Sequence, residues 1–277
     1  MCFDIGNIIA KHPDKCMRKV FLLIIPIMLW CSTVSAGAEK DIHDLQTAVK
    51  KINIAYTHWD IQGFKDAALL CDTVITRNPD NVTAWYWKGT ALFFVALRHL
   101  YTYDKKADSS KGLHTIDQAI ASLNHAIAND PENSESYALR GVLRGMRISL
   151  NPWSVFKHGP RVMQDRDTAL ELDPANPRVH YLTGMSFWHA PEILGGRDKA
   201  LSHLLRAERL FAHEASEEHH PLAPRWGHDL CLACIGDIYR SKKDAVKARH
   251  YYQKALALNP ADPVAAKGLK KLVEHKE

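Results

Sequence analysis

Histidine and cysteine side chains, which could bind a metal or exchange electrons, gather between residues 213 and 234. They are His213, His219, His220, His228, Cys231 and Cys234. Imidazole and thiolate groups are ligands for zinc and copper, and a Cys-x-x-Cys pair can also carry redox chemistry. The spacing does not fit a haem-attachment motif, because Ile235 follows Cys234, and it does not fit a zincin helix, because Glu217 stands where the second histidine is needed. We therefore expect no metal and no cofactor, and a metal- or thiol-dependent function that uses this cluster is the weakest of three hypotheses.

A second set of side chains is basic and follows a helical spacing. Arg140, Arg144 and Arg147 stand at positions i, i+4 and i+7, so they share one helix face, and Lys88 occupies an equivalent place earlier in the chain. A water-filled cleft lined by these cations would accept a carboxylate or a phosphate. The alternative, which we favour, is that these cations pair with acidic residues such as Glu135 or extend to solvent.

Composition and motifs argue against several classes of function. The chain has 277 residues and a net charge of +5, a bias too weak to indicate a nucleic-acid partner. It contains no G-x-S-x-G motif, no P-loop and no dinucleotide fingerprint. These absences favour a protein that is not an enzyme.

The N-terminus has the order of a secretory signal. Basic Arg18 and Lys19 precede an apolar run at 20–30, and the small residues 36–38 follow it. We expect residues 1–38 to be a signal peptide, with residues 1–16 as a candidate upstream extension, and the mature chain to be periplasmic with no membrane span. An uncleaved segment that anchors the chain to the membrane is the alternative. Three cysteines would remain after cleavage, and an odd number cannot form a disulfide framework.

The elements that must position these side chains repeat along the chain. Four similar turns separate apolar-periodic stretches, and they occupy residues 78–81, 130–133, 173–176 and 259–262, each with proline in second place. Proline ends the preceding helix, and Asn or Asp caps the next one. In three cases a glycine stands ten residues after the proline, at Gly89, Gly141 and Gly184. A glycine inside a helix allows a second helix to approach closely, so these positions predict helical hairpins.

The second helices share a small–large–small pattern with a spacing of four and then three residues. It occurs as Ala119, Leu123 and Ala126, as Ala200, Leu204 and Ala207, and as Ala248, Tyr252 and Ala255. Such a spacing forms one stripe on a helix. We expect the large residue to face a small one across the hairpin.

The combined spacing resembles the tetratricopeptide repeat. Residues 229–262 match best, with Leu232, Ile235, Gly236 and Tyr239 on the first helix and Ala248, Tyr252, Ala255 and Pro260 after them. The resemblance implies an all-α solenoid of about five helical hairpins in one domain over 39–277. The expected units are 39–79, 82–131, 134–174, 177–212 and 229–262, with a capping helix at 263–277 whose lysines solvate the free end. Insertions near 94–113, 148–160 and 190–196 lengthen three units, and we expect them to build a pocket over the groove.

A narrower resemblance concerns residues 190–200. The segment Ala190-Pro-Glu-Ile-Leu-Gly-Gly196, followed by Asp198-Lys199-Ala200, is similar to a turn in exported bacterial repeat proteins. It is also similar to the periplasmic repeat subunit associated with some TRAP-type transporters.

The family resemblance places candidate ligand contacts on the concave face lined by the first helices. These are Tyr86, Thr90, Phe93, Tyr181, Met185, Trp188 and Arg240. Aromatic side chains suit recognition, but they are equally common in packed cores. The preferred hypothesis is an exported scaffold that binds a protein or peptide in this groove, with self-association left open. The alternative is an accessory transport subunit that binds a small anionic ligand on the basic helix face.

Overall fold

The computed structural model describes residues 37–101, 109–188, 196–216, 218 and 220–274. The chain divides into two compact units, 1–44 and 45–277. In the first unit the described residues, 37–44, are helical. The expected signal peptide lies almost entirely outside the described residues. Of the helices that are described, none combines the length and the apolar character that crossing a bilayer requires.

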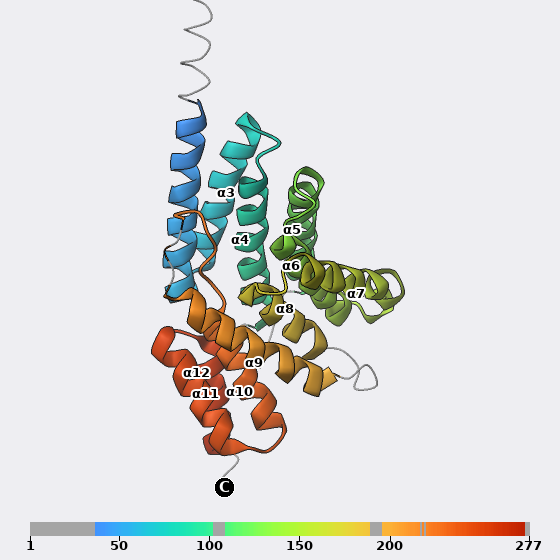
Figure 1. The fold of residues 1–277 in the computed structure, drawn as a ribbon, viewed down its shortest axis with the longest axis vertical. Coiled ribbons are helices and arrows are strands. Elements are labelled where there is room, and N and C mark those ends of the chain that lie inside the picture. The colour runs from blue at the N-terminus through green and yellow to red at the C-terminus, as the bar shows by residue number, and fades with distance from the viewer. Residues whose placement is uncertain (1–36, 102–108, 189–195, 217, 219, 275–277) are drawn as a thin grey trace, which may run out of the picture. The chain divides into compact units, whose positions relative to one another are not determined.

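The second unit is a series of helical hairpins (Figure 1). It begins with a helix over 45–58. The helices that follow are α3 (Ile61–Arg77), α4 (Val82–Tyr101), α5 (Ser109–Asn129), α6 (Ser134–Leu150), the short 3-10 helix η1 (Pro152–Ser154), α7 (Val155–Leu172), α8 (Pro177–Trp188), α9 (Gly196–Glu214), α10 (His228–Ser241), α11 (Ala245–Leu258) and α12 (Pro263–Glu274). Consecutive helices pack as pairs, from α4 with α5 to α10 with α11, and α12 packs on the last pair. In the first pair, Gly63 of α3 lies against Ala55 of the helix over 45–58. The predicted all-α architecture of five hairpins and a closing helix is confirmed, and no strand occurs in the described part of the chain.

The Asn/Asp–Pro turns begin helices as their sequence predicts. The side chain of Asn133 accepts a hydrogen bond from the amide of Ser136 at the start of α6 (2.9 Å). Asn81 accepts from the amide of Ala84 in α4 in the same way. Each cap satisfies a backbone donor that the first turn of a helix leaves unpaired, so the turn chemistry fixes where the hairpins begin.

Glycine faces a large apolar side chain in the second and fourth hairpins. A Cβ atom on Gly89 would lie 2.8 Å from the Leu123 side chain, and one on Gly184 would lie 2.6 Å from Leu204. The large side chain therefore occupies the space that the missing Cβ leaves free, as the small–large pattern predicts. In the third hairpin, however, Gly141 lies against Asp165 rather than against an apolar residue.

The first and last hairpins share an unusual turn. Trp59 and Lys243 both have a left-handed backbone, with φ values of 53° and 61°. Asp60 and Asp244 come next, and each caps the second helix of its hairpin. A bulky residue rarely adopts this conformation, which normally favours glycine. Lys243 is exposed, whereas the indole of Trp59 is 8% exposed and reaches the interior.

The connection between α9 and α10 enters the inner side of the hairpin array. Trp226 is buried, and its ring centroid lies 5.5 Å from that of Phe94 and 6.4 Å from that of Tyr181. The Trp87 indole donates a hydrogen bond to the carbonyl of Leu222 (3.1 Å). This connection is not part of the repeat pattern, yet its side chains complete the core.

The first and fifth hairpins are also in direct contact. The Tyr56 hydroxyl donates a hydrogen bond to Asp229, 173 residues away, and Asn259 donates to the other carboxylate oxygen of Asp229 (2.9 Å). In a simple solenoid each repeat touches only its neighbours. Here the two ends of the array meet.

Candidate ligand-binding site

A cavity of about 250 Å³ opens where the first and last hairpins meet. Its walls come from α4, α8, α10 and α12, together with the turn at Trp59. The lining residues are Trp59, Leu97, Arg98, Tyr181, Met185, Trp188, Leu230, Cys234, Asp237, Arg240, Pro263, Val264, Lys267, Gly268 and Lys271. Three of the four helices are the first helices of their hairpins, so the cavity lies on the face where repeat proteins bind their partners.

The interior of this cavity is apolar and aromatic. Tyr181 and Trp188 stand seven residues apart on α8, and Trp59 is contributed by the strained turn of the first hairpin. Aromatic walls contribute a large contact area with few rotatable bonds to immobilise. The left-handed backbone at Trp59 costs free energy, and in folded proteins such strain concentrates at functional sites.

The mouth of the cavity is positively charged. Arg240 is neutralised by Asp237, its partner at 2.8 Å. Arg98 and Lys271 make no ion pair with any residue that the structure describes. Lys267 adds a further cation, and its pKa is lowered by burial and by the charge of Lys271. An anionic group would relieve the repulsion among these cations.

Four of the predicted groove residues meet in this cavity: Tyr181, Met185, Trp188 and Arg240. The structure places the other three elsewhere. Thr90 and Phe93 are completely buried, so they belong to the packed core around α4. Tyr86 lies beside a separate hollow that is lined mainly by polar and acidic residues.

Sequence reasoning missed part of the cavity. Trp59 lies in a turn between two helices, and Arg98 lies at the end of α4, in the predicted insertion. Lys267 and Lys271 belong to the closing helix, whose lysines we expected to face solvent only. The signals that could have indicated them are a tryptophan at a position that favours glycine and a closing helix with lysines four residues apart.

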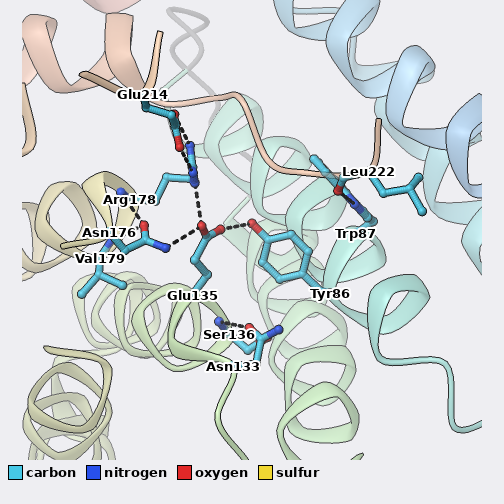
Figure 2. Close-up of polar contacts among 10 residues, drawn as sticks. All are labelled: Tyr86, Trp87, Asn133, Glu135, Ser136, Asn176, Arg178, Val179, Glu214 and Leu222. Atoms are coloured by element: carbon cyan, nitrogen blue, oxygen red, sulfur yellow. Dashed lines mark hydrogen bonds and ion pairs between the residues drawn. The ribbon is translucent and has the colours of Figure 1, made fainter. Parts of the chain in front are cut away.

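Tyr86 belongs to a buried polar network (Figure 2). Its hydroxyl donates to Glu135, which also accepts from Arg178 Nε (2.7 Å) and from Asn176 (2.9 Å). Arg178 makes a second, two-bonded pair with Glu214 at the end of α9. Burial alone would lower the pKa of Arg178, but the adjacent carboxylates outweigh it and raise the pKa above its usual value. This network joins α4, α6, α8 and α9 and fixes the point where the inward-running connection begins.

The predicted basic residues all have acidic partners. Arg140 pairs with Asp165 (2.6 Å), and Arg144 binds the same carboxylate. Lys88 pairs with Asp72 (2.6 Å), and Arg147 pairs with Asp117. The expected pairing is therefore present, but the partner of the arginines is Asp165. Glu135, our example of a partner, binds Arg178 instead.

The histidine and cysteine candidates do not gather around a common point. Cys231 is buried and donates to the carbonyl of Leu204 (3.4 Å), and burial raises the pKa of both Cys231 and Cys234. Thiols with raised pKa values are poor nucleophiles and metal ligands. His228 stacks on Phe211, and His220 accepts from the amide of Leu222. No metal-binding group of three or more His, Cys, Asp or Glu residues occurs among the described residues, and His219 and residues 190–195 lie outside them.

Known proteins share this architecture. A tetratricopeptide repeat profile matches residues 230–262, and a second matches residues 52–93. A thermophilic tetratricopeptide-repeat protein of Thermus thermophilus, TTC0263, is 16% identical, with a TM-score of 0.54 over 82% of this chain and 99% of its own. The HusA haemophore from Porphyromonas gingivalis is 20% identical, with a TM-score of 0.58 over 70% of this chain and 92% of its own. At these identities the two structures establish the fold alone.

A comparison with curated proteins finds no match to this chain. The match at 230–262 covers the last hairpin, and the match at 52–93 runs from the first hairpin into α4; each includes one of the two turns with a left-handed residue. The repeat spacing, the hairpin packing and both matches agree that the chain contains tetratricopeptide repeats at residues 52–93 and 230–262.

Proposed function

We propose that the chain is a non-enzymatic scaffold that binds a protein or peptide partner through the cavity between its first and last hairpins. The tetratricopeptide architecture is that of a protein-interaction scaffold. The observation that carries the proposal is that four of the seven groove residues predicted from the repeat spacing, Tyr181, Met185, Trp188 and Arg240, line one cavity.

The shape of the inner face favours a compact contact over a long extended one. The connection that carries Leu222 and Trp226 already fills part of that face. The cavity, of about 250 Å³, would take an apolar side chain of the partner as an anchor, and buried aromatic anchors dominate binding energies. An acidic group next to that anchor would meet Arg98 and Lys271 at the mouth.

Affinity capture with matched baits tests this proposal. The wild-type chain, Trp188→Ala and Trp85→Ala would be used as baits, and captured proteins identified by mass spectrometry. Trp85 is a partly buried tryptophan of α4 that stacks on His125 outside the cavity, so it controls for the loss of an indole. We expect a partner that the wild type and Trp85→Ala retain and Trp188→Ala loses. Identical captures by all three baits would refute the proposal.

A small anionic ligand is the second candidate, because Arg98 and Lys271 stand unpaired among the described residues at the mouth of a compact apolar cavity. The basic helix face no longer supports this candidate, since its arginines are paired. A panel of aromatic carboxylates in a thermal-shift assay tests it. Stabilisation that disappears in Lys271→Ala but persists in Lys270→Ala, the neighbouring exposed lysine, would favour a small ligand over a protein partner.

Export is the remaining element of the proposal. It is supported by the basic, apolar and small-residue order of residues 18–38. Cell fractionation and N-terminal sequencing of the purified protein test it. A mature N-terminus close to residue 39 is the expected result, and an intact cytosolic chain would contradict it.

A further inference from the structure

The short helix η1 and the first turns of α7 expose an unusual concentration of apolar side chains. Trp153 and Phe156 are 83% and 81% exposed, and Val155 and Met163 are also exposed. The other large apolar side chains that are exposed in the described residues are scattered along the chain. We name these four residues, together with Lys157 and Arg161, the aromatic–basic patch. Moving its four apolar side chains out of water would contribute a favourable free energy that the isolated chain does not gain.

The patch carries cations beside its apolar side chains. Lys157 and Arg161 are exposed, and neither makes an ion pair within the described part of the chain. Burial lowers the pKa of His158, and the charges of Arg147 and Lys157 lower it further; Arg147 itself pairs with Asp117. The first exposed acid further along α7 is Asp167, which lies one turn beyond Met163 and pairs with Arg166.

Helical geometry separates the two kinds of side chain. Phe156 and Met163 are seven residues apart on α7 and share one stripe. Lys157 and Arg161 are four residues apart and form the adjacent stripe. Asp165 and Ala169, which are buried, mark the opposite side, where α7 packs on α6. The result is an apolar stripe with a basic border on the outward side of one helix.

We propose that the aromatic–basic patch binds the surface of an anionic lipid membrane. Tryptophan and phenylalanine insert favourably at the boundary between headgroups and acyl chains. Lysine and arginine beside them attract anionic headgroups electrostatically.

A membrane fits this patch better than a protein partner does. Trp153 and Phe156 project from the surface, whereas the energetically important residues of protein interfaces are enclosed by a ring of neighbouring contacts. A bilayer needs no complementary shape, because its lipids adapt to a projecting side chain.

Vesicle binding by the isolated full chain tests the proposal. The probes are phosphatidylcholine vesicles with and without phosphatidylglycerol, and the readout is co-sedimentation at increasing salt. The test variants are Trp153→Ser/Phe156→Ser and Lys157→Glu/Arg161→Glu. The matched control is Leu69→Ser/Lys65→Glu on α3, which removes an exposed apolar side chain and an exposed cation that are also four residues apart.

A second readout isolates the patch from any other membrane contact of the chain, including one made by its apolar N-terminal segment. Lipids brominated on their acyl chains quench a tryptophan that enters the bilayer, and the difference between the wild type and Trp153→Phe reports on Trp153 alone.

We expect salt-sensitive binding to phosphatidylglycerol vesicles that falls at least about tenfold in both test variants and stays unchanged in the control. We also expect quenching that depends on Trp153. Vesicle binding that is equal in all variants, with no quenching of Trp153, would overturn the proposal. Capture of an acidic protein by the patch in the absence of vesicle binding would overturn it as well.

Discussion

The third and fifth hairpins place a glycine against the facing helix with different chemistry. In the fifth hairpin, Gly236 of α10 faces the Tyr252 ring of α11, and the contact is apolar. In the third hairpin, Gly141 of α6 faces Asp165 of α7, and this carboxylate binds Arg140 and Arg144. The repeat geometry therefore requires a close approach of two helices, but it does not dictate what fills the contact.

The two solutions differ in how they respond to change. An aromatic ring against a glycine is sensitive to added volume, because a packed core has no free space. A buried ion pair is sensitive to the removal of one partner, because the remaining charge stays in a medium of low polarity. Substitutions in the two hairpins should therefore separate the two effects.

The largest effect is expected for Asp165→Ala in the third hairpin. The change leaves Arg140 and Arg144 partly buried with no carboxylate between them, and we expect a loss of about 3–5 kcal/mol in the free energy of unfolding. Urea denaturation measures it. The control is Asp167→Ala, an exposed carboxylate two residues away, which should change stability by less than about 0.5 kcal/mol.

A triple substitution sharpens this prediction. Arg140→Leu, Arg144→Met and Asp165→Leu together give the third hairpin the apolar contact of its neighbours. We expect the triple variant to regain most of the stability that Asp165→Ala loses, because an apolar replacement of a buried ion pair is often neutral. A triple variant as unstable as Asp165→Ala would show that the ion pair is not the cause.

The next effect is expected for Gly236→Ala in the fifth hairpin. The added Cβ would lie 2.6 Å from the Tyr252 ring. Gly268 of α12 is also packed against this ring, so the ring has little room to move. We expect a loss of about 1–3 kcal/mol by thermal or urea unfolding. Gly145→Ala in α6 is the control, since no atom lies within 4 Å of its added Cβ. It should stabilise the protein by roughly 0.5–1 kcal/mol.

A smaller, pH-dependent effect is expected for Asp262→Asn after the fifth hairpin. Burial, reinforced by the charge of Asp229, raises the pKa of Asp262 from 3.8 to about 7. The folded chain therefore holds this proton more tightly than the unfolded chain, so its contribution to stability is complete below pH 3.8 and is lost as the pH rises through 7. Asparagine carries no charge and can still cap α12. We expect Asp262→Asn to be more stable than the wild type by about 1–2 kcal/mol at about pH 8 and equal to it at about pH 4. The same difference at both pH values would contradict this explanation.

The smallest effect is expected for Arg147→Ala, at the outer end of the basic face. Its partner Asp117 is exposed, and exposed ion pairs contribute about 0–1 kcal/mol. Urea denaturation should place this variant close to the wild type. A loss as large as that of Asp165→Ala would show that burial does not decide the strength of these pairs.

The hairpins were predictable from sequence because their signals are local. Proline turns, capping residues and the small–large pattern all act within one repeat, so the close approach of two helices at Gly89 could be predicted. Asp165 could not be predicted as the partner of the arginines, since it lies 25 residues after Arg140, on the other helix of the hairpin. The cavity was only partly predictable, because Trp59 and Lys271 reach it through the contact of the first and last hairpins, which no repeat spacing encodes.

That contact has a consequence for how the protein folds. In an open array of repeats, stability is a sum of local terms, and the terminal repeats unfold first. The bonds from Tyr56 to Asp229 and from Trp87 to Leu222 instead connect opposite ends of the unit and close it into a loop. Closing a loop of this length costs chain entropy that only the complete set of contacts repays. We expect the helix over 45–58 and α10 to exchange their amide hydrogens with the same free energy, as parts of one cooperative unit, although 173 residues separate Tyr56 from Asp229.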